Sequence, residues 1–253
     1  MRYAKILSET ERYANFNTIC PNSISLWLLR ATLDTSIILY CYDYYHYSLM
    51  KTREVHAIME SEPSKEGQMP LAAAKKSTSS HELSLSQYTA ARDYLLVALT
   101  RTVGTRPNAL EMATLGQFRM AKWDQKERSK VMLVTGHKRE MEGPAPIPMS
   151  KEMVEQLGVF TTKLRLLVTQ DFSDSGKIFL KSNGAPYQKG TIGRRITAFV
   201  IKSGVRADRL ISATDFRKWL VTRMKDHKWA GVPIDEDLLQ RLMCHGDKMA
   251  QSW

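Results

Sequence analysis

Residues 99–110 read Leu-Thr-Arg-Thr-Val-Gly-Thr-Arg-Pro-Asn-Ala-Leu. Gly104 marks the end of the preceding helix, because glycine readily adopts the left-handed conformation in which many helices end. Pro107 suits the first turn of a second helix, where its missing N–H is not needed. Arg106 is therefore expected between a helix end and a helix start, where its guanidinium and the nearby helix amides can bind a phosphate oxygen.

The segments on both sides of this turn predict an α+β domain that is mostly helical and contains a small sheet. Upstream, Ser84 or Ser86 caps a helix whose apolar residues recur at helical spacing up to Gly104. Downstream, short apolar segments separated by turns predict a three-stranded antiparallel sheet. The expected strands are 117–123, 130–135 and 145–149, and a short strand and turn are expected at 178–184. The remaining expected helices are 151–168, 189–203, Ser212 or Thr214 to Met224, and Pro233 to His245.

Composition divides the chain into three parts. Residues 1–59 are rich in apolar and aromatic residues and predict a helical N-terminal region. Residues 60–83 contain two prolines, a glycine and a Ser/Thr cluster, which predict a linker. Residues 84–253 form the second domain, and the 43% hydrophobic content suffices for a packed core.

The excess of positive over negative charge lies in the C-terminal part of the chain. Residues 1–100 hold 10 Lys/Arg and 10 Asp/Glu, whereas residues 101–253 hold 27 and 16. A basic domain beside a neutral one indicates a polyanionic partner, since neutralising phosphates with Lys and Arg releases counterions. The alternative is a basic surface that is merely solvated.

Several classes of protein are disfavoured by the same composition. The three cysteines form no Cys-x-x-Cys pair, so we expect no metal site and a reducing compartment. Charged residues interrupt the most apolar stretch, residues 24–47, which argues against a membrane span. The first residues lack the pattern of a secretory signal, so the protein is not expected to be secreted.

Three further residues have settings suited to phosphate chemistry. Lys138 lies at the expected hairpin turn before residues 145–149, where it can protonate a departing oxygen or contact a DNA backbone. Its neighbours His137 and Arg139 are alternatives for the same role. Arg217 projects from the first turns of its helix, and His245 follows an apolar helical stretch. Two arginines on one phosphate would stabilise a pentacoordinate transition state.

The order Arg106, Lys138, Arg217, His245 resembles the tyrosine recombinase (phage integrase) family. The resemblance covers about residues 84–253: residues 91–115 resemble the family's first arginine box, Arg217 its His-x-x-Arg box, and His245 its Leu-Gly-His box. The form Ala-Thr-Asp-Phe-Arg-Lys at 213–218 is closest to recombinases of Crypton-like eukaryotic mobile elements.

This resemblance implies a catalytic domain that cuts and rejoins double-stranded DNA through a phosphotyrosine intermediate. It also implies a helical core-binding domain before it, of which residues 1–59 would be a part. It implies no metal and no nucleotide cofactor, and a homo-oligomer, a tetramer, on DNA. A nuclear location is expected if the source is eukaryotic, and a cytoplasmic one otherwise. The further residues expected to contact DNA are Arg139, Lys189, Arg194, Arg195 and Lys218.

The chain departs from the family's pattern at three points. Thr214 replaces the histidine of the His-x-x-Arg box and cannot carry a proton near neutral pH. Ala109 stands where an acidic residue is expected, with Glu111 as the possible substitute. No tyrosine follows Tyr187, so the chain is expected to be truncated before its nucleophile or to be inactive.

Three hypotheses therefore stand at the level of sequence. The first is an incomplete site-specific recombinase, and the second is a catalytically inactive DNA-binding module derived from a mobile element. The third is a helical protein-interaction domain with a solvated basic face.

Overall fold

The computed structural model describes residues 50–76, 83–124, 129–137, 141, 143–206 and 209–229. The described residues belong to one compact unit that begins at Met50. Most of the expected N-terminal region, the hairpin residues Lys138 and Arg139, and the last expected helix with His245 lie outside the described residues.

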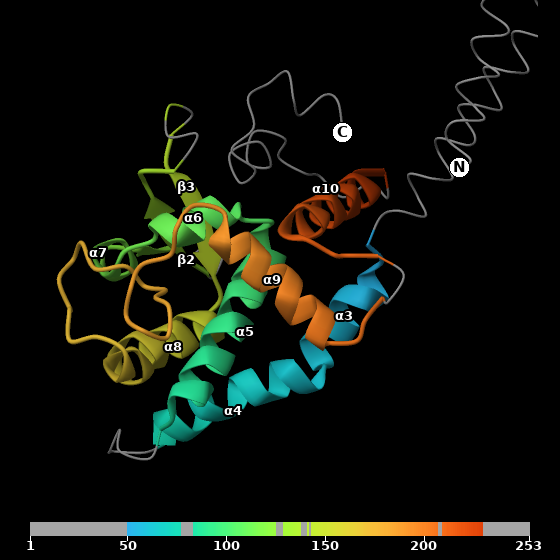
Figure 1. The fold of residues 1–253 in the computed structure, drawn as a ribbon. Helices are drawn as coiled ribbons and strands as arrows, with labels where there is room; N and C mark the ends of the chain where they lie inside the picture. Colours follow the sequence, from blue (N-terminus) through green and yellow to red (C-terminus); the bar gives the residue numbers. More distant parts are fainter. Residues whose placement is uncertain are drawn as a thin grey trace, which may run out of the picture. The chain divides into compact units, whose positions relative to one another are not determined.

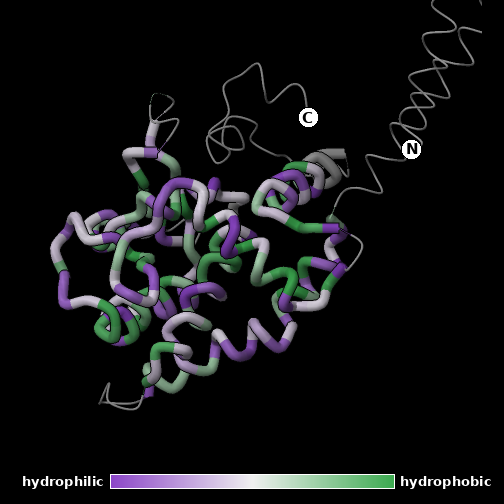
Figure 2. The backbone as a smooth tube through the Cα atoms, in the orientation of Figure 1, coloured by the Kyte–Doolittle hydropathy of each residue, from purple (hydrophilic) through white to green (hydrophobic). Residues whose placement is uncertain are grey.

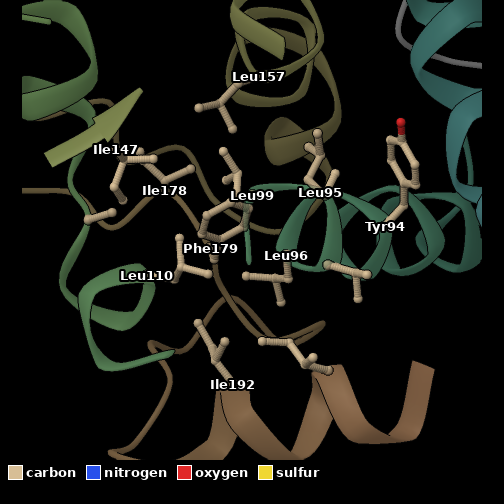
Figure 3. Packing of buried hydrophobic residues seen from close by; sticks show 14 of the residues in the cluster. Tyr94, Leu95, Leu96, Leu99, Leu110, Ile147, Leu157, Ile178, Phe179 and Ile192 are labelled. Carbon is tan, nitrogen blue, oxygen red and sulfur yellow. The ribbon is translucent and has the colours of Figure 1, made fainter. Parts of the chain in front are cut away.

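Helix α5 (Leu85–Val103) lies at the centre of the unit (Figure 1). It contacts α4, α9, α10 and strand β3, and its residues Leu95, Leu96 and Leu99 are fully buried. Figure 3 shows these leucines among side chains from the surrounding elements. Both ends of the helix are as expected: Ser84 forms a capping box with Gln87, and Gly104 ends the helix with φ 57°. This confirms the mostly helical core predicted around residue 99.

Helix α4 (Glu62–Lys76) occupies most of the segment expected to be a linker, and it packs on α5. The helix is hydrophilic along much of its length (Figure 2), which explains why its composition indicated a linker. Its contact face is narrow: Gly67, Leu71 and Ala74 are buried. Gly67 permits the close approach, because a Cβ there would lie 2.3 Å from the Cβ of Tyr94.

Helix α3 (Thr52–Glu60) precedes α4 and contacts it, with Val55 and Ile58 buried. The Ser64 hydroxyl, from α4, donates a 2.7 Å hydrogen bond to the Ile58 carbonyl oxygen. Residues 50–59, expected in the N-terminal region, therefore share a core with the C-terminal elements.

The expected three-stranded antiparallel sheet is present. It contains β1 (Lys122–Asp124), β2 (Ser129–Val134) and β3 (Ala145–Met149), in the order β1-β2-β3. Met132 pairs with Ile147, and both are buried. The first strand is shorter than expected, because residues Leu115–Arg119 form helix α7, which Thr114 and Gln117 start with a capping box.

The remaining elements complete the cover of α5. They are α6 (Pro107–Met112), α8 (Lys151–Val159), the π-helical turn η2 (Phe160–Leu164), the 3₁₀ turn η3 (Arg165–Leu167), α9 (Thr191–Lys202) and α10 (Ala213–Trp229). The helix expected at 151–168 thus changes type midway. The strand expected at 178–180 is reduced to two isolated bridges, one just before it, between Thr114 and Lys177, and one at its last residue, between Leu180 and Pro186. No helix among the described residues has the length and apolarity needed to cross a membrane.

Candidate functional site

Arg106 occupies the tight turn between α5 and α6. Gly104 turns the chain with a positive φ, and Arg106 is the N-cap residue of α6, with Pro107 as its first helical residue. The Arg106 carbonyl accepts a 2.9 Å hydrogen bond from the Ala109 amide, which closes the first turn of α6. The Arg106 side chain is half-buried and its Nε is fully buried, so part of the guanidinium lies below the protein surface.

Arg217 reaches this turn from a distant part of the chain. Its Nε donates a 2.9 Å hydrogen bond to the carbonyl oxygen of Gly104, two residues before Arg106. The hydrogen bond uses one edge of the guanidinium and fixes its plane, because the five N–H donors of arginine form a rigid fork. The segment that carries Arg106 and the segment that carries Arg217 therefore meet at Gly104. The sequence indicated that they are neighbours only through the order of the arginines along the chain.

Asp215 stabilises the first turn of α10, the helix that carries Arg217. One Asp215 carboxylate oxygen accepts from the Ser212 amide at 2.8 Å and from the Ser212 hydroxyl at 2.7 Å. The other accepts from Nη1 of Arg209 at 2.9 Å. Burial alone would raise the pKa of Asp215, but the hydrogen bonds from Ser212 and Arg209 outweigh burial and lower that pKa. Thr214, in the same turn, is exposed.

Farther along α10, the Trp219 indole nitrogen donates a 3.2 Å hydrogen bond to the Thr52 hydroxyl of α3. Lys218 is half-buried on the same helix. The position of α10 is therefore defined by contacts on both sides of Arg217, one with the α5–α6 turn and one with α3.

Glu111, expected as a possible substitute for the family's acidic residue, is buried and joins α6 to α9. Its Oε1 accepts a 3.1 Å hydrogen bond from the Ile192 amide in the first turn of α9, and its Oε2 accepts a 3.2 Å hydrogen bond from the Asn108 amide group. A carboxylate at a helix N-terminus also interacts favourably with the helix dipole. In this position Glu111 fixes the start of α9 beside the Arg106 turn.

His137 is buried at the base of the β2–β3 hairpin. Its Nε2 lies 3.1 Å from the carbonyl oxygen of Gly143, on the returning side of the hairpin. This contact closes the loop that contains the expected lysine, Lys138. His137, expected as an alternative to Lys138, therefore contributes a contact across the base of the hairpin.

A cavity of about 280 Å³ lies beside the Arg106 turn. Its lining comes from α6, from the hairpin and from the loop before α9: Asn108, Glu111, Met112, Gly136, His137, Tyr187 and Lys189. Burial raises the pKa of the Tyr187 phenol, whose ring lies 5.5 Å from the Arg92 guanidinium. No group of three or more His, Cys, Asp or Glu side chains suited to a metal ion occurs in the part of the chain that the structure describes.

The residues expected to contact DNA fall into two groups. Lys189, in the loop before α9, and Arg194, in the first turn of α9, are exposed, as a phosphate contact requires. Arg195 points elsewhere: it pairs with Asp93 of α5, which also pairs with the buried Arg92 at 2.9 Å. Burial would lower the pKa of Arg195, but the Asp93 carboxylate outweighs burial and raises it. Arg195 lines a different cavity, of about 560 Å³, with Asp93.

Two of the supporting contacts were missed at the level of sequence. Asp215 stands three residues after Ser212, a spacing typical of helix starts that could have identified it. The Gly104 carbonyl that accepts from Arg217 leaves no signal in the sequence, because any backbone carbonyl is an acceptor.

No family model and no curated protein matches the chain. Solved structures do resemble it. A XerA recombinase is matched with a TM-score of 0.50 and 16% identity, over 80% of this chain and 57% of that one. XerH site-specific recombinase bound to difH substrate, in a pre-cleavage complex, is matched with a TM-score of 0.56 and 14% identity, over 81% of this chain and 49% of that one.

The post-cleavage complex of XerH with a palindromic difH substrate is matched with a TM-score of 0.54 and 13% identity, over 80% of this chain and 48% of that one. The chain therefore spans about half the length of the recombinase structures that it matches. The expected fold class is confirmed: helices packed around α5 and a three-stranded antiparallel sheet make up the fold of a tyrosine recombinase catalytic domain.

Proposed function

We propose that this protein is a recombinase-like protein that binds double-stranded DNA and holds one backbone phosphate between Arg106 and Arg217. The observation that carries this proposal is the hydrogen bond from Arg217 to the Gly104 carbonyl, since it joins the two arginine-bearing segments in a recombinase fold. Paired guanidinium donors on one phosphate suit both tight binding and stabilisation of extra negative charge.

The wider surface supports the same assignment. Lys189 and Arg194 are exposed around the start of α9, which Glu111 fastens to the helix that follows Arg106. With Lys218, they would contact neighbouring phosphates and orient the duplex without reading its sequence. The excess of Lys and Arg after residue 100 would add sequence-independent affinity. Arg195 is left out of this set because it pairs with Asp93.

We further propose that the chemistry is strand cleavage and rejoining of the tyrosine recombinase kind, as in Crypton-like mobile elements. The nucleophile would be the oxygen of a tyrosine that lies outside residues 188–253, which contain none. It would attack the phosphorus, and the bond to the 5′ oxygen would break. Lys138 would protonate the departing 5′ oxygen, while His245 would help to stabilise the charge. Oligomerisation on DNA, as a tetramer, belongs to the same proposal.

DNA binding is tested by fluorescence anisotropy with a labelled duplex over a range of salt concentrations. Arg106→Ala and Arg217→Ala should each weaken binding about 10- to 100-fold, the loss of a charge-assisted contact. Each should also reduce the slope of log K against log[salt] by about one. Arg119→Ala is the matched control, because it removes the same charge from an exposed arginine paired with Asp174. Equal effects of all three changes would refute the phosphate site.

Cleavage is tested separately. Duplexes of randomised sequence are enriched for binding, nicked near their centres and incubated with residues 1–253 and with the same chain extended by any residues that its gene encodes after Trp253. Intact mass then reports any covalent protein–DNA adduct. An adduct that Arg106→Ala or Arg217→Ala abolishes supports the recombinase. DNA binding that depends on both arginines, without an adduct, identifies a DNA-binding module of the same fold.

A further inference from the structure

We propose that Asp215 is a positioning residue that sets Arg217 for its phosphate by fixing the first turn of α10. This inference rests on the proposed function, since it concerns how the phosphate-binding arginine is held. Asp215 itself contacts no phosphate in this arrangement, because its carboxylate faces the start of its own helix.

The Asp215 carboxylate accepts hydrogen bonds from three donors on two residues. Ser212 supplies its amide and its hydroxyl to one oxygen, and Arg209 supplies Nη1 to the other. The Asp215 side chain is 15% exposed, so these donors, rather than water, satisfy most of its hydrogen-bonding capacity. Such a carboxylate at the third position of a helix fixes where the helix begins.

The start of the helix matters because Arg217 lies only two residues farther on. Arg217 Nε is held at 2.9 Å from the Gly104 carbonyl, a distance that tolerates little movement of the helix backbone. Fraying of the first turn would release the backbone of Arg217 and return rotamer freedom to its long side chain. The guanidinium would then have to be ordered again each time that DNA binds.

Arg209 has a second effect, which is electrostatic. A bare carboxylate two residues from Arg217 would repel a phosphate bound there, and the ion pair with Arg209 cancels much of that repulsion. The pair therefore supplies the helix start with a carboxylate cap without adding net negative charge beside the proposed phosphate.

The test is a double-mutant cycle on the full chain, read out as DNA affinity and as its salt dependence. Asp215→Ala should weaken DNA binding about five- to tenfold. It should also reduce the salt slope towards that of Arg217→Ala, by up to about one. The double variant should bind no more weakly than Arg217→Ala alone, because both changes remove the same contact. Asp215→Asn, which keeps an oxygen for the Ser212 amide, should restore part of the affinity.

Ser150→Ala is the matched control. The Ser150 side chain also caps a helix start, since it accepts a 3.2 Å hydrogen bond from the Met153 amide. The helix that it caps is α8, which packs on α4 and on strands β2 and β3. Thermal unfolding of each variant shows the loss of stability, which a merely structural role would produce in both. Ser150→Ala should leave the salt slope unchanged.

Two failures are distinguishable. If Arg217→Ala leaves the affinity and the salt slope unchanged, the proposed function fails. If Arg217→Ala weakens binding but Asp215→Ala only lowers the melting temperature, or adds its effect fully to that of Arg217→Ala, the positioning role is overturned. A reduced salt slope in Ser150→Ala would overturn it as well, since the effect would then follow from the loss of any helix cap.

Discussion

Replacing Gly67 by alanine sets two opposite effects against each other within α4. In an isolated helix, alanine is more favourable than glycine by about 1 kcal/mol. In this protein, however, a Cβ at residue 67 would lie 2.3 Å from the Cβ of Tyr94 and 2.8 Å from the Ala90 carbonyl oxygen. Neither atom can move away alone, because a Cβ and a carbonyl oxygen are fixed by the backbone of α5.

The sizes of these two effects decide whether Gly67→Ala stabilises or destabilises the protein. Carbon atoms in contact normally lie about 3.5–4.0 Å apart, so α4 would have to shift by more than about 1 Å at its tightest contact with α5. Overpacking of this kind costs about 1–3 kcal/mol, and the rigidity of both partners places Gly67→Ala at the upper end. After the gain in helix propensity, a net loss of about 2 kcal/mol remains, or about 4–8 °C in melting temperature.

Thermal unfolding followed by far-UV circular dichroism measures the effect, with Gly158→Ala as the control. Gly158 lies in α8, and a Cβ there would meet nothing within 4 Å, so this change should stabilise the protein by up to about 1 kcal/mol. If Gly67→Ala stabilises the protein as Gly158→Ala does, α4 does not pack on α5 as described.

Three further outcomes are expected. Gly104→Ala should lower the free energy of unfolding by about 1–2 kcal/mol in denaturant unfolding, because residue 104 has φ 57°. It should also weaken DNA binding, measured by fluorescence anisotropy, because it displaces the carbonyl that accepts from Arg217. Unchanged values of both quantities would contradict the role of this turn. Ser84→Ala should cost about 1 kcal/mol in denaturant unfolding by removing the cap of α5, and a neutral result would show that the cap contributes nothing to stability. Because the pKa of Asp215 is lowered in the folded protein, its contribution to stability is present above its unfolded pKa and is lost as the pH falls below about 4 through its folded pKa. The Asp215→Asn protein should therefore lose less stability on acidification than the unchanged protein. Stability curves of the two proteins that fall in parallel with pH would contradict this.

Local signals predicted much of the fold. The start of α5 at Ser84, its end at Gly104 and the start of α6 at Pro107 were each expected from residue types acting within one turn of the chain, and all are present. The sheet was expected from short apolar runs and turns, and β2 and β3 agree with the prediction closely. The assignment of catalytic roles to Arg106, Lys138, Arg217 and His245 remains a prediction.

The structure adds information where the same residue type has two uses. Gly67 and Pro70 indicated a linker, since both residues commonly interrupt helices, but both lie in helix α4, where Gly67 serves close packing against Tyr94. Arg195 was expected on the DNA-binding surface, and in the structure it pairs with Asp93; its contact with DNA remains a prediction. Nothing near either residue in the sequence distinguishes these uses, because the partner lies on another helix.

The sequence by itself determined where helices begin and end around Arg106, because capping and backbone preferences act between residues that are neighbours in the chain. It also determined that the excess of Lys and Arg over Asp and Glu lies after residue 100. Only the tertiary structure decided that Arg217 lies against the Gly104 carbonyl and that α4 covers α5. These contacts join distant segments, and they depend on how the buried faces of several helices fit together, which no local pattern specifies.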